Sequence, residues 1–190
     1  MILGPQGAGK GTQAKRIAST FGIPHIATGD MFRAAIANGS ALGKQVEPLL
    51  ASGTLVPDDL TISLIRERLG EDDAADGFVL DGFPRNLAQA EALDAMFNET
   101  GRDFTVVLAL QVSDAVATQR LTKRSELEGR ADDRPDAIVK RLETYHRETE
   151  PLIEYYRARD LLAPIDGDHP EPEVYGQIEQ ALAAAEEHVR

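Results

Sequence analysis

The sequence has no cysteine and no tryptophan among its 190 residues, and only 5% of them are aromatic. The lack of cysteine excludes disulfides, thiolate metal sites and a cysteine nucleophile. Long hydrophobic runs are also missing, since the longest, residues 105–110, has the length of one strand. The start has neither the basic residues nor the apolar stretch of a signal peptide. We therefore expect a cytoplasmic protein with no membrane partner.

Positive charge is scarce as well. The 20 Lys and Arg residues face 32 Asp and Glu, which gives a formal net charge of −12. An acidic chain repels nucleic acids, so no nucleic-acid partner is expected. The signs are unevenly distributed: residues 150–190 hold ten acidic and three basic residues, whereas residues 120–147 hold eight basic and six acidic ones. An anionic ligand would meet a local cluster of basic residues.

The order of apolar segments indicates the fold class. Short apolar runs alternate with longer helical patterns, and the runs cover residues 2–3, 25–27, 78–80, 105–110 and 163–165. Continuous runs of this kind, alternating with helices, are typical of a parallel sheet covered on both faces. We predict a single α/β domain with a doubly wound five-stranded parallel sheet. Residues 28–57 and 120–147 do not fit this alternation, and insertions at strand-to-helix junctions often carry lids and substrate sites.

A glycine-rich segment, residues 4–12, follows the first apolar run and precedes a helical pattern; it reads Gly4-Pro5-Gln6-Gly7-Ala8-Gly9-Lys10-Gly11-Thr12. Glycines let backbone N–H groups close around a phosphate, and the following helix adds its positive end. Lys10 can neutralise the outer phosphates. The hydroxyl that usually follows the lysine comes one place later, at Thr12, which is therefore a candidate magnesium ligand. This segment predicts a phosphate loop.

A second motif, Asp81-Gly82-Phe83-Pro84-Arg85, ends the third apolar run. A carboxylate at the carboxyl end of a buried strand beside a phosphate loop suits magnesium (Mg²⁺) bound through water, which is the role expected for Asp81. Arg85, just beyond, can bind an anion. The histidines, at positions 25, 146, 169 and 188, lack the spacing of a zinc site. We expect no protein-bound zinc, and core or surface roles for these histidines.

Together these motifs resemble those of the nucleoside monophosphate kinases, and the adenylate kinase family in particular, along nearly the whole chain. The family's AMP segment corresponds to Thr28-Gly29-Asp30-Met31, with Arg33 two residues on. The resemblance implies phosphoryl transfer from MgATP to AMP, giving two ADP, by a monomer whose partners are ATP, AMP and ADP. It implies a single kinase domain, 1–190, with a core of residues 1–27, 57–123 and 135–190, a helical AMP-binding insertion of residues 28–56 and a short lid loop of residues 124–134.

The same resemblance implies roles for individual residues. The implied catalytic residues are Lys10, Arg85, Arg124, Arg130 and Arg141. The implied ATP-binding residues are Gly7, Ala8, Gly9, Lys10, Gly11, Thr12, Arg120, Arg124 and His169, the last through backbone groups near residues 167–169. The implied AMP-binding residues are Thr28, Arg33, Leu55, Val56, Gly82, Arg85, Gln89, Arg130 and Arg141.

The acceptor base stays open at this point. Uridylate/cytidylate kinases generally have a small apolar residue where this chain has Thr28, so its hydroxyl favours adenine. Thr28 could equally cap a helix that begins near Asp30. A UMP/CMP kinase is therefore one alternative, and a sensor that binds ATP and AMP without turnover is another.

Only residues 125–129 separate Arg124 from Arg130, which resembles the short-lid form of the family.

Overall fold

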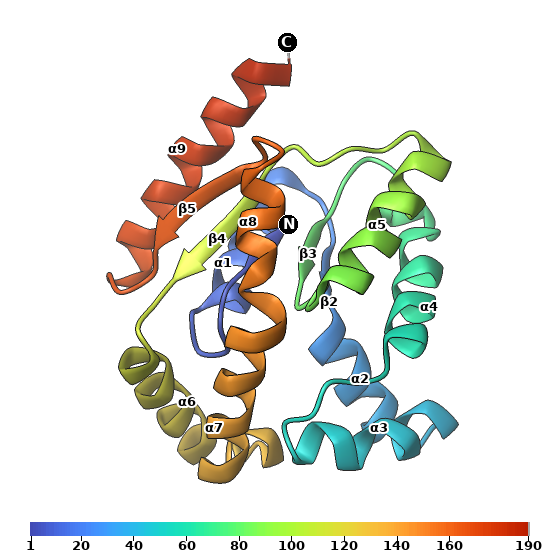
Figure 1. Ribbon diagram of the computed structural model, residues 1–190, viewed down its shortest axis with the longest axis vertical. Helices are drawn as coiled ribbons and strands as arrows, with labels where there is room; N and C mark the ends of the chain where they lie inside the picture. The colour runs from blue at the N-terminus through green and yellow to red at the C-terminus, as the bar shows by residue number, and fades with distance from the viewer. Residues whose placement is uncertain (190) are drawn as a thin grey trace.

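The computed structural model describes residues 1–189. Five parallel strands form one sheet, in the order β2-β3-β1-β4-β5. The strands are β1 (Ile2–Leu3), β2 (His25–Ala27), β3 (Val79–Asp81), β4 (Val107–Gln111) and β5 (Leu162–Asp166). The predicted α/β class and the doubly wound sheet are confirmed (Figure 1). The central strand β1 is the shortest: Ile2 pairs with Asp81 on one side and with Leu108 on the other.

Helices connect successive strands and cover both faces of the sheet (Figure 1). They are α1 (Lys10–Phe21), α2 (Thr28–Ala37), α3 (Ala41–Ala51), α4 (Asp58–Leu69), α5 (Leu87–Thr100), α6 (Asp114–Glu128), α7 (Pro135–Thr144), α8 (Pro151–Arg157) and α9 (Glu171–Val189). Short turns stand between some of them, namely η1 (Asp72–Ala74), η2 (Ala131–Asp133) and the π-helical η3 (Tyr145–Thr149), which joins α7 to α8. No helix within residues 1–189 is long and apolar enough to cross a membrane.

Alternation along the strands divides the core into two layers. Ile2 and Leu108 pack with residues of α1 and α9 on one face. Leu3 and Val107 pack on the other face, against Tyr156 and other residues around α8. Because successive strand residues point to opposite faces, a strand buried on both sides needs a continuous apolar run, and this is why the runs were visible in the sequence.

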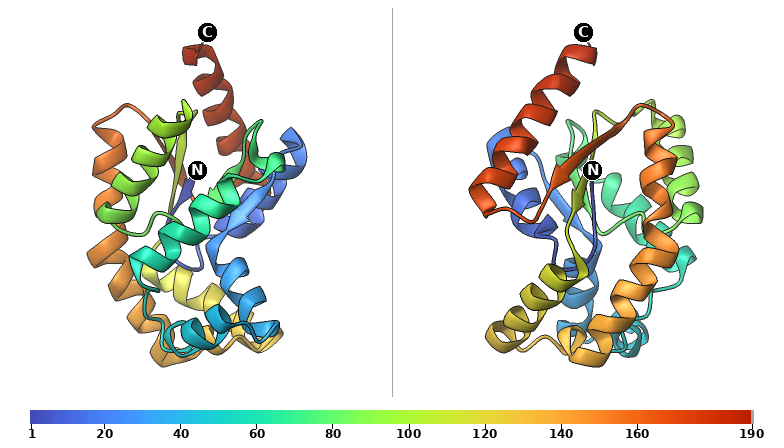
Figure 2. Two further views of the ribbon diagram at one scale, coloured as in Figure 1. Left: turned by 90° about the vertical axis from the view of Figure 1, so that its right-hand side faces the viewer. Right: turned by 60° about the vertical axis from the view of Figure 1, so that its left-hand side comes forward.

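The insertion between β2 and α4 is helical, as predicted. Its helices α2 and α3 project from the carboxyl edge of the sheet (Figure 2). They approach so closely that a Cβ on Gly43 would lie 2.1 Å from the carbonyl oxygen of Ala35. Only glycine fits at this crossing, so the two helices form one packed unit.

The lid differs from the expected loop. Helix α6 continues through Arg124 and ends at Glu128, because residues 125–128 are compatible with helix and no stop signal occurs before Gly129. Gly129 has a φ of 62° and its N–H donates to the carbonyl oxygen of Ser125, a helix-ending geometry that favours glycine. Arg124 therefore stands on a helix, and only Arg130 of the pair lies on the connecting segment.

Candidate active site

Because the strands are parallel, their carboxyl ends lie along one edge of the sheet. The order of the strands reverses beside β1: β2 and β3 lie on one side of it, and β4 and β5 lie on the other. Two adjoining cavities open there. The larger cavity, about 390 Å³, is lined by predicted residues Gly7, Gly9, Lys10, Gly11, Thr12, Asp81, Arg120, Arg124 and Arg130. The smaller pocket, about 60 Å³, is lined by Thr28, Leu55, Val56 and Gln89. Both are lined by Arg33, Gly82, Arg85 and Arg141, which form a shared wall.

Two of the predicted residues line neither cavity. Ala8 is 3% exposed and packs in the core beneath the loop. The imidazole of His169 is half exposed and lies 3.2 Å from the Asp166 carboxylate and 3.4 Å from that of Glu173. The backbone near it contacts a residue that lines the larger cavity, because the carbonyl oxygen of Gly167 accepts a hydrogen bond from Arg120 Nη2 at 2.9 Å.

The glycine-rich segment forms a tight turn, and the side chain of Lys10 folds back onto it. Gly7 and Gly9 have φ angles of 84° and 92°, and a Cβ on Gly7 would lie 2.6 Å from the carbonyl oxygen of Ala117. Lys10 Nζ donates to the carbonyl oxygens of Gly4 and Pro5, both at 2.8 Å. Burial lowers the pKa of Lys10 to about 8, although the nearby Asp81 charge opposes this shift. The ammonium group thus lacks a carboxylate ion-pair partner among the described residues, and an added anion would stabilise its charge.

Asp81 lies where the third strand ends, facing the first turn of α1. A Cβ on Gly11 would lie 3.6 Å from Asp81 Oδ2, and the same oxygen lies 3.2 Å from His25 Nε2. Burial by itself would raise the pKa of Asp81, but the His25 hydrogen bond and the charge on Lys10 outweigh it and hold this pKa below its usual value. Asp81 is therefore an anion at neutral pH.

His25 is a site neighbour that sequence reasoning missed, because it was given only a core or surface role. The alternation of side chains between the two faces of a strand could have placed His25 near Asp81. His25 and Ala27 share one face of β2, and Ala27 pairs in register with Asp81.

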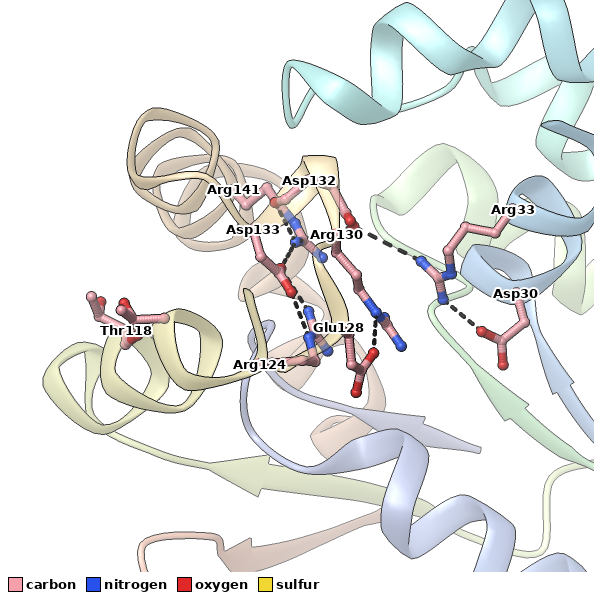
Figure 3. A network of polar contacts seen from close by, with 10 residues as sticks. Asp30, Arg33, Thr118, Arg124, Glu128, Arg130, Asp132, Asp133 and Arg141 are labelled. Carbon is pink, nitrogen blue, oxygen red and sulfur yellow. Dashed lines mark hydrogen bonds and ion pairs between the residues drawn. The ribbon is translucent and has the colours of Figure 1, made fainter. Parts of the chain in front are cut away.

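Three arginines of the larger cavity, Arg124, Arg130 and Arg141, are held by carboxylates (Figure 3). Asp133, whose side chain is 0% exposed, accepts from Arg124 Nε at 2.6 Å, from Arg124 Nη2 at 2.7 Å and from Arg141 Nη1 at 2.8 Å. Arg130 Nε donates to Glu128 at 2.6 Å. Burial by itself would raise the pKa of Asp133, but hydrogen bonding to Arg124 and the charges of both arginines lower it. These guanidinium groups are thus aligned and partly neutralised before any ligand binds.

Arg33 is held in the same way from the opposite side of the cavity. Its guanidinium lies 2.6 Å from Asp30 and 3.8 Å from Asp132, which also lies 3.3 Å from Arg141 (Figure 3). Asp132 and Asp133 belong to this ion-pair network, but in the sequence they were counted only as charges. Nothing in their spacing from Arg124 and Arg141 marks the pairing, because it arises when η2 folds against α6 and α7.

Arg85 differs from these arginines because no carboxylate of the described residues forms an ion pair with it. Its Nε donates to the carbonyl oxygen of Gly82 at 2.8 Å, and its own carbonyl oxygen accepts from Thr149 Oγ1 at 2.6 Å. Burial, together with the charge of Arg141, lowers the pKa of Arg85 to about 10. Arg85 is therefore a charged, desolvated group in the wall between the two cavities, and an anion there would relieve its burial cost.

Thr28 has a different local role from the one that its position suggested. Helix α2 begins at Thr28 itself, its cap residue is Ala27, and Thr28 makes no capping hydrogen bond. Its hydroxyl instead donates to the carbonyl oxygen of Gly82 at 2.9 Å. The capping alternative is thus wrong, because the helix starts two residues earlier than expected and directs this side chain toward β3. Gly82 is required opposite it, since it has a φ of 77° and a Cβ there would lie 2.8 Å from Thr28 Oγ1.

Gln6 is another residue that the sequence left without a role. It lines both cavities, and its Oε1 is buried without a hydrogen-bond partner among the described residues. For metal binding, no cluster of three or more His, Asp or Glu ligands occurs within the described part of the chain. A metal ion at this edge would therefore take few of its ligands from the protein and would need others from an anionic substrate.

Comparison with known proteins identifies the family to which this site belongs. The family model described as adenylate kinase matches residues 2–161. The chain is 52% identical to the adenylate kinase of Cyanothece sp. (strain PCC 7425 / ATCC 29141), over 96% of this chain and 93% of the relative. It is 49% identical to that of Parvibaculum lavamentivorans, over 96% and 90%, and 51% identical to that of Leifsonia xyli subsp. xyli, over 96% and 92%. The family model, which covers most of the chain, and relatives about half identical to it show that the chain belongs to the adenylate kinase family and is a phosphotransferase.

Proposed function

We propose that the larger cavity binds MgATP and that the smaller pocket binds the base and ribose of AMP, with phosphoryl transfer between them to give two ADP. The observation that carries this assignment is the shared wall of Arg33, Arg85 and Arg141. Two nucleotides bound on either side of it would bring their phosphates together at these three cations.

The chemistry requires positioning and charge neutralisation more than a covalent or basic group. The transferring phosphoryl group carries its charge on peripheral oxygens, and planar guanidinium groups can bind such oxygens in pairs. Lys10 and Arg85 have no carboxylate partner among the described residues, so incoming phosphates would complete their charge pairing. Arg124 and Arg141 would turn part of their hydrogen bonding from Asp133 to the phosphates. We assign transition-state stabilisation to these four residues together with Arg130.

Asp81 and Thr12 fit a magnesium site that is completed by the nucleotide. Asp81 is an anion facing the first turn of α1, and Thr12 lies on that turn at the rim of the same cavity. A single carboxylate plus substrate phosphates is a usual environment for this ion. When bound, magnesium neutralises phosphate charge. Asp81 would hold it through water, and the hydrogen bond from His25 would orient the carboxylate.

Substrate entry would require movement of the predicted AMP-binding insertion, residues 28–56. The smaller pocket has about 60 Å³, well below the roughly 300 Å³ at which small-molecule sites begin. Because α2 and α3 pack tightly on each other, we propose that they move as one unit to admit AMP. The short lid around Arg130 and this unit would then close together and exclude water.

The acceptor is proposed to be AMP because Thr28 and Gln89 both line the smaller pocket and present polar groups there. Initial rates with AMP, UMP and CMP, measured by coupled ADP detection with MgATP, test this proposal. We expect AMP to be the best acceptor; a preference for UMP or CMP would make the protein a uridylate/cytidylate kinase. Binding of ATP and AMP without ADP formation would instead support a sensor.

A monomeric, cytoplasmic enzyme without nucleic-acid or membrane partners also stays a proposal. The family resemblance is what supports the monomer. Sedimentation with and without nucleotides measures the oligomeric state, and fractionation of cells measures the location.

A further inference from the structure

A hydrogen-bonded network adjoins Gln89 in the smaller pocket. Asp58, the first residue of α4, accepts from Gln89 Nε2 at 2.7 Å and from Asn86 Nδ2 at 2.9 Å, both on Oδ1. Gln89 is 2% exposed and lines the pocket, whereas Asp58 is not part of the described lining. Asp58 is therefore connected to the pocket through its hydrogen bond with the amide of Gln89.

A glutamine amide can take two orientations that exchange its oxygen and nitrogen, and here two partners of opposite character select one of them. The backbone N–H of Arg85 donates to Gln89 Oε1 at 2.8 Å, and a donor cannot pair with the amide nitrogen. The Asp58 carboxylate can only accept when ionised, so it selects Nε2. One N–H and one oxygen lone pair remain on the amide for a ligand.

This remaining donor and acceptor distinguish purines in which the donor and acceptor positions are exchanged. Adenine presents a ring-nitrogen acceptor beside an amino donor, which matches an amide with fixed orientation. Hypoxanthine presents a ring N–H donor beside a carbonyl acceptor, which matches only the exchanged orientation. IMP differs from AMP by this exchange of the amino group for an oxygen, so the two nucleotides test the orientation of the amide.

We propose that Asp58 is a positioning residue that holds the Gln89 amide in the orientation that accepts adenine and rejects 6-oxopurines. This inference rests on the proposed function, in which Gln89 contacts the acceptor base. A purely structural role would be a favourable charge in the first turn of α4. Asp59 stands in the same turn, is exposed and carries the same charge, so it offers a matched control.

The experiment compares kcat/KM for AMP with kcat/KM for IMP, at saturating MgATP, in the wild type and in variants whose thermal midpoints are also measured. For Asp58→Ala we expect the AMP/IMP ratio to fall at least about tenfold, the factor that corresponds to the loss of a hydrogen bond to a charged acceptor. Asp59→Ala should leave the ratio unchanged. Asp58→Asn keeps an oxygen that can accept from Nε2, so it should stay within about threefold of the wild type.

Gln89→Ala separates this inference from the proposed function. If Gln89→Ala lowers the AMP/IMP ratio and Asp58→Ala does not, Asp58 does not position the amide, and the acceptor assignment still stands. If Gln89→Ala also leaves the ratio unchanged, Gln89 does not read the base, and the roles assigned to Gln89 and to Asp58 are both overturned. Should Asp58→Ala not fold, Asp58→Ser replaces it, because serine suits a helix start and is too short to reach the amide. An unchanged ratio in that variant overturns the inference as well.

Discussion

Replacing Asp133 by asparagine should lower the free energy of unfolding more in the enzyme without nucleotide than in the nucleotide-bound enzyme. Its carboxylate, 0% exposed, accepts three hydrogen bonds from Arg124 and Arg141. Breaking a buried ion pair costs about 3–5 kcal/mol. Arg124 is 29% exposed and Arg141 keeps Asp132 at 3.3 Å, so solvent and a second carboxylate reduce this loss. We expect a loss of about 2–3 kcal/mol in the free energy of unfolding.

The assay is urea unfolding of wild type and Asp133→Asn, with and without saturating MgATP. We expect the difference between them to shrink to about 1 kcal/mol with nucleotide, because bound phosphates supply a new anionic partner to both arginines. Asp136→Asn is the matched control, since the Asp136 side chain is 75% exposed at the start of α7. Its effect should be within about 0.5 kcal/mol.

The stability that Asp133 contributes should fall as the pH is lowered. The folded-state pKa of Asp133 is lowered, so its stabilising effect is present above the unfolded pKa and is lost as pH falls through the folded pKa. The difference between wild type and Asp133→Asn should therefore shrink as pH falls below the usual pKa of an aspartate, and it should disappear below the lowered folded-state pKa of Asp133. A variant as stable as wild type at pH 7, or a deficit that nucleotide does not change, would refute the reasoning.

Further predictions concern three other residues of the site. Lys10→Met should lower kcat about 10²-fold or more with a smaller effect on KM for ATP, measured in steady state, because its charge acts where phosphate charge shifts during transfer; an unchanged kcat would remove it from the mechanism. In the wild type, kcat/KM for ATP should fall as pH rises through about 8, where free Lys10 loses its proton, and a profile that stays flat to pH 10 contradicts that pKa. Arg85→Lys should lower kcat/KM for AMP about tenfold or more despite its retained charge, since paired N–H donors are lost; equal activity would mean that charge alone suffices. Thr28→Ala should narrow the preference for AMP over UMP whereas Thr28→Ser keeps it, and an intact preference in both would exclude a role for the hydroxyl.

Residues that act through their own place in a strand or loop could be predicted from the sequence. The glycine-rich loop and Asp81 both follow buried strands, and parallel strands bring their carboxyl ends to one edge, so motif and fold support each other. The strands themselves were visible because two-sided burial requires continuous apolar runs, as in Val107 to Leu110.

Residues that act through a distant partner could not be predicted. Asp58 pairs with Gln89 across 31 positions, and His25 pairs with Asp81 across 56 positions. Such pairs depend on which helices and strands pack together, and neither partner has a local spacing that marks it. The two-residue difference at the start of α2 had a similar effect, because it decided whether Thr28 caps a helix or bonds to Gly82.

The carbonyl oxygen of Gly82 links two residues for which separate functions are proposed, Thr28 and Arg85. It accepts from Thr28 Oγ1 at 2.9 Å and from Arg85 Nε at 2.8 Å. A substitution of Thr28 by a residue without a hydroxyl, made to alter the proposed base preference, would also remove one of the two donors to this oxygen. The position of the Arg85 guanidinium, which supplies the other donor, would then change as well. Redesign of this enzyme for another acceptor base would therefore change its turnover as well, unless the new side chain at position 28 restores a donor to that oxygen.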